Sequence, residues 1–250
     1  DGHSVERAAE LLANATSPLV IAGGGVHTAQ AVEALDRLIT IGCLPVATTN
    51  MGKGVVDETG PLSLGVAANL LGRNGPATAH RDLIAKADVV LLIGTRTNEN
   101  GTDAWSLTAP GATYIHVDID GTEVGRNYEA LRLVGDARAA IQDLTAALQR
   151  RDLSKRRDRA GALIAEIAAA RQIRAEAIAP QMQADMRPIL PQRLMGELDR
   201  RIGPDDIVVA DASYSSVWVT GYLTTRRAGQ RFLTPRGLAG LGWGLPFAIG

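Results

Sequence analysis

The residues best suited to binding chemistry lie in a glycine-rich tract near the end of the sequence. The tract reads RGLAGLGWGLP from Arg236 to Pro246, and five of the eight residues from Gly237 to Gly244 are Gly or Ala. Such a segment forms neither a stable helix nor a stable strand. It lets the backbone approach a ligand closely, and Leu241 adds one bulky apolar side chain. A flexible linker is the alternative, but linkers favour Ser and charged residues over Leu, Trp and Phe.

A second candidate is the polar turn at residues 211–216. It follows the apolar run of residues 207–210, which is typical of a buried strand. Open α/β sheets bind their ligands at the carboxyl ends of their strands. The turn is therefore a candidate binding segment.

A third candidate is the run of Gly23, Gly24 and Gly25, which directly follows the apolar segment PLVIA. Glycines between a strand and a helix let a phosphate or a flat ring approach the backbone, and the helix N-terminus attracts anions. The spacing is not G-x-G-x-x-G, and no acidic residue is placed to bind a ribose hydroxyl, which disfavours a Rossmann dehydrogenase. A tight turn that binds no ligand is the alternative.

Two further polar groups also follow apolar runs. Gly94 and Arg96 come after VVLLI, and Arg96 could clamp a phosphate or carboxylate, or donate to neighbouring loop carbonyls. Asp118 and Asp120 point the same way if their strand continues. They could hold nucleotide hydroxyls, but capping and turn formation are the favoured interpretation. No His or third carboxylate stands nearby at metal-ligand spacing, so the sequence predicts no metal site there.

Short apolar strands alternate with helical patterns over residues 1–150 and predict the elements that position these groups. Continuous apolar strands indicate a sheet covered on both faces, and the alternation indicates parallel connections, so we expect a doubly wound α/β domain. Asp136 is well placed to cap the last of its helices. The expected helices are 4–14, 30–41, one that ends within 82–87, and Ala137–Gln149; the expected strands are Pro18–Ala22, 44–47, Val89–Ile93, 114–117 and 131–134.

The composition changes near Gln149 and suggests a second part of the chain. Residues 150–174 are rich in Ala, Arg and Glu and predict an exposed or loosely docked helix, while residues 178–192 contain three prolines and predict an extended linker. A second α/β pattern follows, with a helix at 194–202 and strands at 207–210 and 231–233. We therefore expect a central domain at 1–150, a helix and linker at 151–192 and a second domain at 193–250. The sequence stops inside an apolar, helix-like run, so we expect the second domain to be incomplete.

The bulk composition limits the class of protein. Apolar residues make up 46% of the chain, charged residues 21%, and the net charge is -1, which suggests neither a nucleic-acid nor an anionic-membrane partner. No apolar run approaches the ~18 residues that span a bilayer, and no signal peptide is visible. The single cysteine, Cys43, excludes an internal disulfide and is predicted to be a buried, small apolar residue.

The glycine-rich tract resembles that of the thiamine-diphosphate-dependent decarboxylases and carboligases. Acetolactate synthases carry S-G-G-L-G-T-M-G-F-G-L-P-A-A-I-G, and this chain reads P-R-G-L-A-G-L-G-W-G-L-P-F-A-I-G from Pro235. The segments LVIAGGGV, TTNMGKG, PLSLG, GTR and DID, and then VVADASYSSVW, also follow the order of that family. The resemblance covers nearly the whole chain and points to the acetolactate synthase-like group.

The resemblance implies roles for residues of both the tract and the turn. Ala239, Gly240 and Leu241 would hold the aminopyrimidine ring of thiamine diphosphate, with Leu241 as the wedge that bends the cofactor. The bend brings the imino group near the thiazolium C2, and the resulting ylid attacks a 2-oxo acid. The diphosphate would lie on the turn that contains Ser213, Tyr214 and Ser215, although the family has Gln and His at the last two of these positions.

The resemblance further implies a lyase or carboligase (a transferase) that acts on a 2-oxo acid such as pyruvate. It implies a cytoplasmic homodimer or tetramer with no nucleic-acid or membrane partner. The family binds magnesium through a G-D-G motif and a later Asn, which we expect beyond Gly250, and its activating glutamate would precede Asp1. We therefore expect a piece of a longer parent chain that carries no catalytic or metal-binding residue and is inactive alone.

An FAD- or ADP-binding module with a regulatory or structural role is the alternative function. Some middle domains of this family bind such a nucleotide, but Asn98 and Asn100 stand where its FAD-binding loop tends to have Asp and Arg, so FAD is not favoured. The residues that a nucleotide or FAD would contact are Gly23, Gly24, Gly25, Thr49, Met51, Gly94, Arg96, Asp118 and Asp136.

Overall fold

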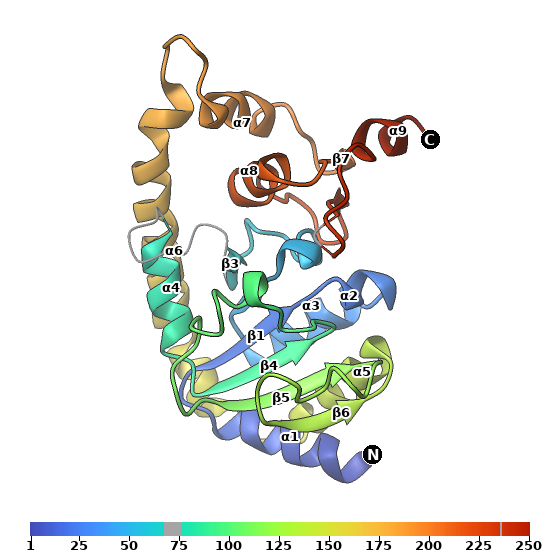
Figure 1. Ribbon diagram of the computed structural model, residues 1–250. Helices are drawn as coiled ribbons and strands as arrows, with labels where there is room; N and C mark the ends of the chain where they lie inside the picture. The colour runs from blue at the N-terminus through green and yellow to red at the C-terminus, as the bar shows by residue number, and fades with distance from the viewer. Residues whose placement is uncertain (68–76, 236) are drawn as a thin grey trace.

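The chain forms a larger α/β unit and a smaller unit that are connected by one long helix. The computed structural model describes residues 1–67, 77–235 and 237–250, so Arg236 of the glycine-rich tract lies outside the described residues. Helix α6 (Ser154–Gln183) runs beside both units, and the C-terminus lies in the smaller one (Figure 1). No helix in these described ranges is both long and apolar enough to cross a membrane.

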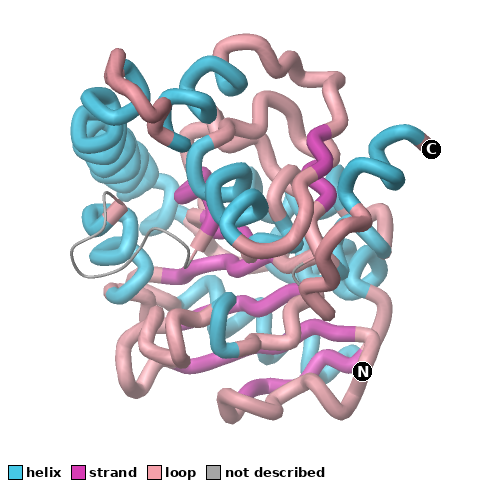
Figure 2. Tube along the Cα trace, turned by 45° about the horizontal axis from the view of Figure 1, so that its top comes forward, coloured by secondary structure: helices cyan, strands magenta, loops and turns pink. Residues whose placement is uncertain are grey.

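The larger unit is built on a six-stranded sheet in which every neighbouring pair of strands is parallel, in the order β3-β2-β1-β4-β5-β6. This confirms the predicted doubly wound α/β class. The strands lie edge to edge, with helices on both sides of them (Figure 2). Their bounds are β1 Pro18–Ala22, β2 Val46–Thr48, β3 Ser63–Val66, β4 Val89–Ile93, β5 Thr113–Asp118 and β6 Ala130–Val134.

The two faces of the sheet have separate apolar cores because successive side chains of a strand point to opposite faces. Val89, Leu91 and Ile93 of β4 pack on the face covered by α1 (Gly2–Asn14), α3 (Val32–Gly42) and α5 (Ala137–Gln149). Val90 and Leu92 pack on the other face, against α4 (Thr78–Ala85) and α6. Each of these fully buried side chains stabilises the fold by about 1.5–3 kcal/mol.

The smaller unit has its own core around two short parallel strands, β7 (Val208–Val209) and β8 (Phe232–Leu233). Helices α7 (Pro191–Asp199) and α8 (Tyr214–Tyr222) pack beside them, and α9 (Gly244–Ile249) follows the glycine-rich tract. Ile178 of α6 also belongs to this core, so the long helix contributes to both units.

The linker prediction is wrong for part of residues 178–192. Helix α6 continues through Pro180 to Gln183, and α7 begins at Pro191, which leaves only residues 184–190 outside helices in this segment. A proline inside a helix removes one hydrogen bond. Ile178, two residues before Pro180, is buried in the core of the smaller unit, and this packing holds the helix together there. The prediction that Cys43 is buried is also wrong. It is partly exposed and ends α3 in the left-handed conformation, with φ of 47°.

A loop of the larger unit, residues 53–58, makes most of the polar contacts with the smaller one. Lys53 Nζ donates to both carboxylate oxygens of Glu58, at 2.8 and 2.7 Å, and Glu58 Oε2 accepts from the backbone N–H of Thr225 at 2.9 Å. Gly54 has φ of 95°, and a Cβ there would lie 1.9 Å from the carbonyl oxygen of Gln230. Only glycine fits this close approach between the two units.

Three more short helices lie in the described part of the larger unit. These are α2 (Gly25–Thr28), η1 (Asn50–Gly52) and η2 (Glu99–Gly101), and each follows the carboxyl end of a strand. They lie at the edge of the sheet where open α/β folds bind ligands.

Candidate functional site

The glycine-rich tract is irregular from Gly237 to Trp243, as its composition predicts. Ala239 and Gly242 have left-handed backbone conformations, with φ of 55° and 89°. The N–H of Ala239 donates to the carbonyl oxygen of Pro235 at 2.7 Å, which closes a turn at the start of the tract. Helix α9 begins only at Gly244.

The carboxylate of Asp211 fastens this tract to the end of β7. Its Oδ2 accepts from the N–H of Gly242 at 2.8 Å and from that of Gly244 at 3.4 Å. The N–H of Ala212, together with these two donors, holds the pKa of Asp211 below its ordinary value. A Cβ on Gly244 would lie 3.1 Å from the backbone nitrogen of Asp211, so the two segments touch.

The turn that follows Asp211 leads into the N-terminus of α8. Ser213 is the N-cap, and it has φ of 68°, which is rare for a residue other than glycine. Its side chain makes no capping hydrogen bond, and no acidic residue lies in the first turn of the helix. Ser215 Oγ instead donates to the carbonyl oxygens of Asp211 and Ala212. The positive end of α8 is thus open to an anion.

The structure brings together the two segments assigned to thiamine diphosphate, although their side chains are exposed. Leu241 is 76% exposed and Leu238 is fully exposed, so neither packs into the core of either unit. A Cβ on Gly240 would meet no atom within 4 Å, so the space beside it is open. Leu241 therefore presents a free apolar surface a few residues from the tether to Asp211.

The glycines at the ends of β1 and β4 pack against one another. A Cβ on Gly23 would lie 2.2 Å from the carbonyl oxygen of Gly94, and one on Gly25 would lie 2.6 Å from its Cα. Gly94 itself has φ of 58°. Close backbone packing accounts for these three glycines without a ligand. Gly24 is less confined, with the Cβ of Met51 at 3.1 Å from its own added Cβ.

Most of the other candidate nucleotide contacts form local turns and caps. Thr49 caps η1 by accepting from the N–H of Gly52 at 3.1 Å. Asp118 accepts from the N–H of Asp120 at 3.0 Å, as turn formation predicts. Asp136 caps α5 by accepting from the N–H of Ala139 at 3.0 Å, which confirms its predicted capping role.

Met51 and Arg96, two of the candidate nucleotide contacts, lie near the beginning of the glycine-rich tract. Thr234 Oγ1 lies 3.8 Å from Met51 Sδ, and a Cβ on Gly237 would lie 3.7 Å from a guanidinium nitrogen of Arg96. Among the described residues, the guanidinium of Arg96 has no hydrogen-bond or ion-pair partner. The alternative interpretation, in which it donates to neighbouring loop carbonyls, is therefore wrong for the described residues. The strand ends of the larger unit and the tract of the smaller one thus border a common region.

The sequence of residues 5–144 matches the family described as thiamine pyrophosphate enzyme, central domain. The chain belongs to this family. The match covers all six strands of the sheet and most of α1 to α5, so the larger unit corresponds to the central domain of a thiamine pyrophosphate enzyme, with α6 beyond the matched residues. The resemblance inferred from the glycine-rich tract is thereby confirmed by a different part of the chain.

Similar proteins extend the likeness beyond the central domain. The probable acetolactate synthase large subunit of Methanocaldococcus jannaschii is 33% identical over 259 residues, which cover all of this chain and 41% of that protein. An acetolactate synthase of Arthrospira platensis is 32% identical over 98% of this chain and 41% of its own length. The isozyme 2 large subunit of Escherichia coli is 29% identical over the same shares. This chain spans about two fifths of the length of these relatives.

Two features of the site were not predicted from the sequence. The first is the tether from Asp211 to the tract, and the second is the left-handed conformation of Ser213. An aspartate at the end of an apolar run was a signal for the first, because its carboxylate can accept from nearby backbone N–H groups. Ser213 gave no signal, since serine is common in ordinary turns.

Proposed function

We propose that this chain is part of a thiamine-diphosphate-dependent lyase or carboligase of the acetolactate synthase-like group, which acts on a 2-oxo acid such as pyruvate. One observation carries the proposal. The carboxylate of Asp211 holds the glycine-rich tract against the N-terminus of α8, so an anion site and an apolar surface lie beside each other. Membership of the thiamine pyrophosphate enzyme family and the named relatives support the same function.

The diphosphate group fits the N-terminus of α8. Ser213, Tyr214 and Ser215 would bind it with backbone N–H groups and with those hydroxyls that are not already donating, and the helix dipole would stabilise the negative charge. Strain at a residue other than glycine is often found where a backbone is shaped for a ligand, and Ser213 has such a conformation. The pKa of Asp211 lies below its ordinary value, so this carboxylate stays ionised and keeps its hydrogen bonds at neutral pH.

The ring system fits the tract. The backbone of Ala239 and Gly240 would lie along the aminopyrimidine, and Leu241 would wedge against it and exclude water from one side. Burying most of an exposed leucine side chain under a ring would stabilise the complex by about 1.5–3 kcal/mol. When bound, the cofactor supplies a nucleophilic carbon that adds to the carbonyl group of the substrate.

Magnesium, an oligomeric state of at least a dimer and a cytoplasmic location are part of this proposal. Within residues 1–67, 77–235 and 237–250, no three His, Cys, Asp or Glu side chains gather where they could hold a metal ion. We therefore assign no residue of the described chain to magnesium and no step to the ion.

The alternative of an FAD- or ADP-binding module is not favoured. The glycines at the strand ends pack against each other, and Thr49, Asp118 and Asp136 form caps and turns, so these residues are explained without a nucleotide. Of the candidate residues, the exposed guanidinium of Arg96 and the 45% exposed side chain of Met51 lack such an explanation.

A binding experiment on this chain tests the proposal. Trp243 lies in the tract and stacks edge-on against Phe247 at 4.9 Å, so its fluorescence should report a ligand there. We expect thiamine diphosphate to bind at least about tenfold more tightly than thiamine, because thiamine lacks the anion for α8. Asp211→Ala should weaken binding by a similar factor, whereas Asp143→Ala, an exposed change on α5, should not. Equal affinities for the two ligands, or a fully retained affinity in Asp211→Ala, would refute the site.

A further inference from the structure

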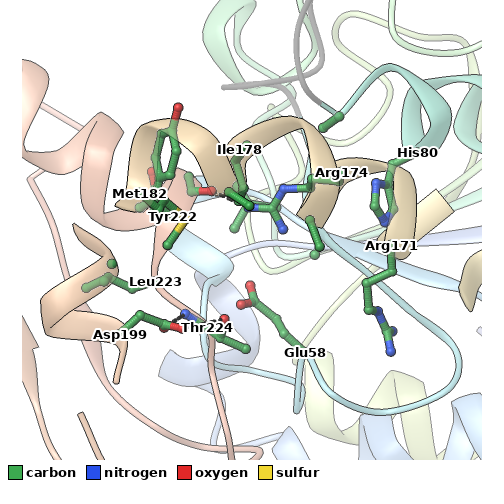
Figure 3. A pocket seen from close by; sticks show the side chains of 18 of the residues that line it. Glu58, His80, Arg171, Arg174, Ile178, Met182, Asp199, Tyr222, Leu223 and Thr224 are labelled. Atoms are coloured by element: carbon green, nitrogen blue, oxygen red, sulfur yellow. Dashed lines mark hydrogen bonds between the residues drawn. The ribbon is translucent and has the colours of Figure 1, made fainter. Parts of the chain in front are cut away.

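A cavity of about 340 Å³ lies between the two units, beside helix α6. Its walls come from α4 and β3 of the larger unit, from α6, and from α7 and the end of α8 in the smaller one. Figure 3 shows His80, Arg171 and Arg174 on one side of the view and Asp199 and Thr224 on the other. None of the residues proposed above for thiamine diphosphate lines this cavity.

The charged side chains around the cavity are mostly basic. The acids are Glu58 and Asp199, and the bases are Lys53, Arg171, Arg174 and Arg200. Both acids are already paired, since Glu58 binds Lys53 at 2.7 Å and Asp199 binds Arg226 at 3.0 Å. Arg200 is paired with Glu197 outside the cavity. Arg171 and Arg174 are the positive charges that remain.

Neither of these two arginines forms an ion pair with any carboxylate in the described part of the chain. Arg171 donates to the backbone carbonyl oxygens of Gly60 and Ser63 at 2.7 and 2.9 Å. Arg174 donates to that of Gly221. A guanidinium has five N–H donors, so Arg174 keeps donors that this single carbonyl does not use. Two partly buried cations close together raise the affinity of the cavity for an anion.

His80 adds a buried polar group without a partner. The residue is only 3% exposed, and its Nδ1 has no hydrogen-bond partner among the described residues. Burial, with the nearby charges of Arg174 and Arg171, lowers the pKa of His80 to about 4, so the ring is neutral at pH 7. A buried nitrogen without a partner is costly, and buried polar groups are almost always bonded. A ligand oxygen that reached this nitrogen would remove the cost.

We propose that this cavity binds the carboxylate or phosphate group of a small anionic metabolite, with Arg174 as the main charge partner, Arg171 beside it and His80 as a neutral hydrogen-bond donor. The volume suits a compact ligand, near the lower end of the range for small-molecule sites. The walls come from both units, so the bound anion would join them through α6. Binding therefore stabilises the arrangement of the central domain against the smaller unit.

The probes are inorganic phosphate and malonate, which separate the two sources of an oxyanion. Thermal unfolding of the chain is followed at pH 7 while each anion replaces chloride at constant ionic strength, up to about 50 mM. We expect a saturable rise in the midpoint with at least one of them, because a ligand that binds only the folded state stabilises it. Each variant is compared with its own midpoint without the probe, so a change in basal stability does not affect the comparison.

The variants identify where the anion binds. Arg174→Gln and His80→Leu should each weaken the apparent affinity at least about tenfold, the loss expected for one charge-assisted or buried hydrogen bond. Arg157→Gln makes the same change on the exposed surface of α6 and should bind like the unchanged chain. The pKa of His80, measured by NMR, should rise when the anion binds, because a nearby negative charge favours the imidazolium.

Two results would overturn the proposal. One is the absence of a saturable effect from both probes. The other is an effect of equal size in the unchanged chain, Arg174→Gln and His80→Leu, which would be a general effect of the salts on stability. A response to phosphate alone, or to malonate alone, would support the site and name the chemical class of its ligand.

Discussion

Replacing Glu58 with glutamine would leave the ammonium group of Lys53 buried without its charge partner. The Lys53 side chain is 1% exposed and that of Glu58 is 10% exposed. The same ammonium lies 4.9 Å from the ring centre of Phe232, a residue of the smaller unit's core. The pair thus lies where the two units meet, and its loss should be measurable in the stability of the whole chain.

The size of the effect follows from the geometry. At 2.8 Å and an effective dielectric constant of ~20, the attraction is about 6 kcal/mol, much of which offsets desolvation. Measured losses for breaking a buried pair are about 3–5 kcal/mol. Deprotonation of Lys53 sets an upper limit on this loss, because the neutral amine no longer needs a charge partner. Its ordinary pKa of 10.5 lies about 3.5 pH units above neutrality, at about 1.4 kcal/mol each, which gives about 5 kcal/mol.

The assay is urea unfolding, followed by far-UV circular dichroism and tryptophan fluorescence. Glu58→Gln should lower the free energy of unfolding by about 3–5 kcal/mol at pH 7, while Glu129→Gln, an exposed control, should change it by less than about 0.5 kcal/mol. Combining Glu58→Gln with Lys53→Met should recover most of the loss, because an apolar side chain of similar length needs no partner.

The pH dependence gives an independent check. Burial lowers the pKa of Lys53 and the charge of Glu58 opposes that shift, so Glu58→Gln should lower the pKa further. Between that folded-state pKa and 10.5, the unfolded chain binds a proton that the folded chain does not, so stability rises with pH. The deficit of the variant should therefore shrink as the pH approaches 10.5. A deficit below about 1 kcal/mol at pH 7, or one that grows with pH, would refute the reasoning.

Three further changes test other contacts. In urea unfolding, Gly54→Ala should destabilise the fold by about 3 kcal/mol or more, because its Cβ would overlap a carbonyl oxygen of the smaller unit. Gly111 has a similar φ but open space around it, so Gly111→Ala should cost only about 1 kcal/mol. Asp136→Ala should cost about 1 kcal/mol in the same assay by removing the cap of α5, and Asp143→Ala, an exposed change on that helix, should cost less. His80 has a pKa of about 4 in the folded chain and an ordinary value of 6.5, so between these pH values the unfolded chain binds a proton that the folded chain does not. The free energy of unfolding should therefore fall by up to about 3 kcal/mol as the pH is lowered from 6.5 to 4. The fall in stability over this range, measured by urea unfolding, should be smaller in His80→Leu.

Five of the six strands of the described sheet were predicted, and β1 and β4 at its centre are continuous apolar runs, whereas β3 (Ser63–Val66) was not predicted. The bounds predicted for the strands Pro18–Ala22 and Val89–Ile93 agree with the structure residue for residue. Full burial on both faces leaves few alternatives for such segments. The prediction failed where tertiary packing outweighs local preference, as at Pro180, which lies inside α6 because its neighbour Ile178 is buried.

The candidate site was predictable in its parts but not in its assembly. The residues of the tract and of the turn were identified by composition and by resemblance, yet the sequence does not reveal that Asp211 joins them. The cavity beside α6 gave no signal at all. Its walls come from segments far apart in the chain, and Arg174 and His80 are ordinary residues of helices until the fold brings them together.

The segment from Thr49 to Glu58 shows how packing can account for residues that resemble a ligand-binding motif. Thr49 caps η1, and a Cβ on Gly52 would lie 2.2 Å from the carbonyl oxygen of the last residue of β1. Lys53 and Gly54 make the charged and close-packed contacts with the smaller unit, and Glu58 completes them. Each of these residues has a structural reason for its type. A ligand role for this segment therefore has to come from Met51, whose side chain is 45% exposed and lies at the beginning of the glycine-rich tract.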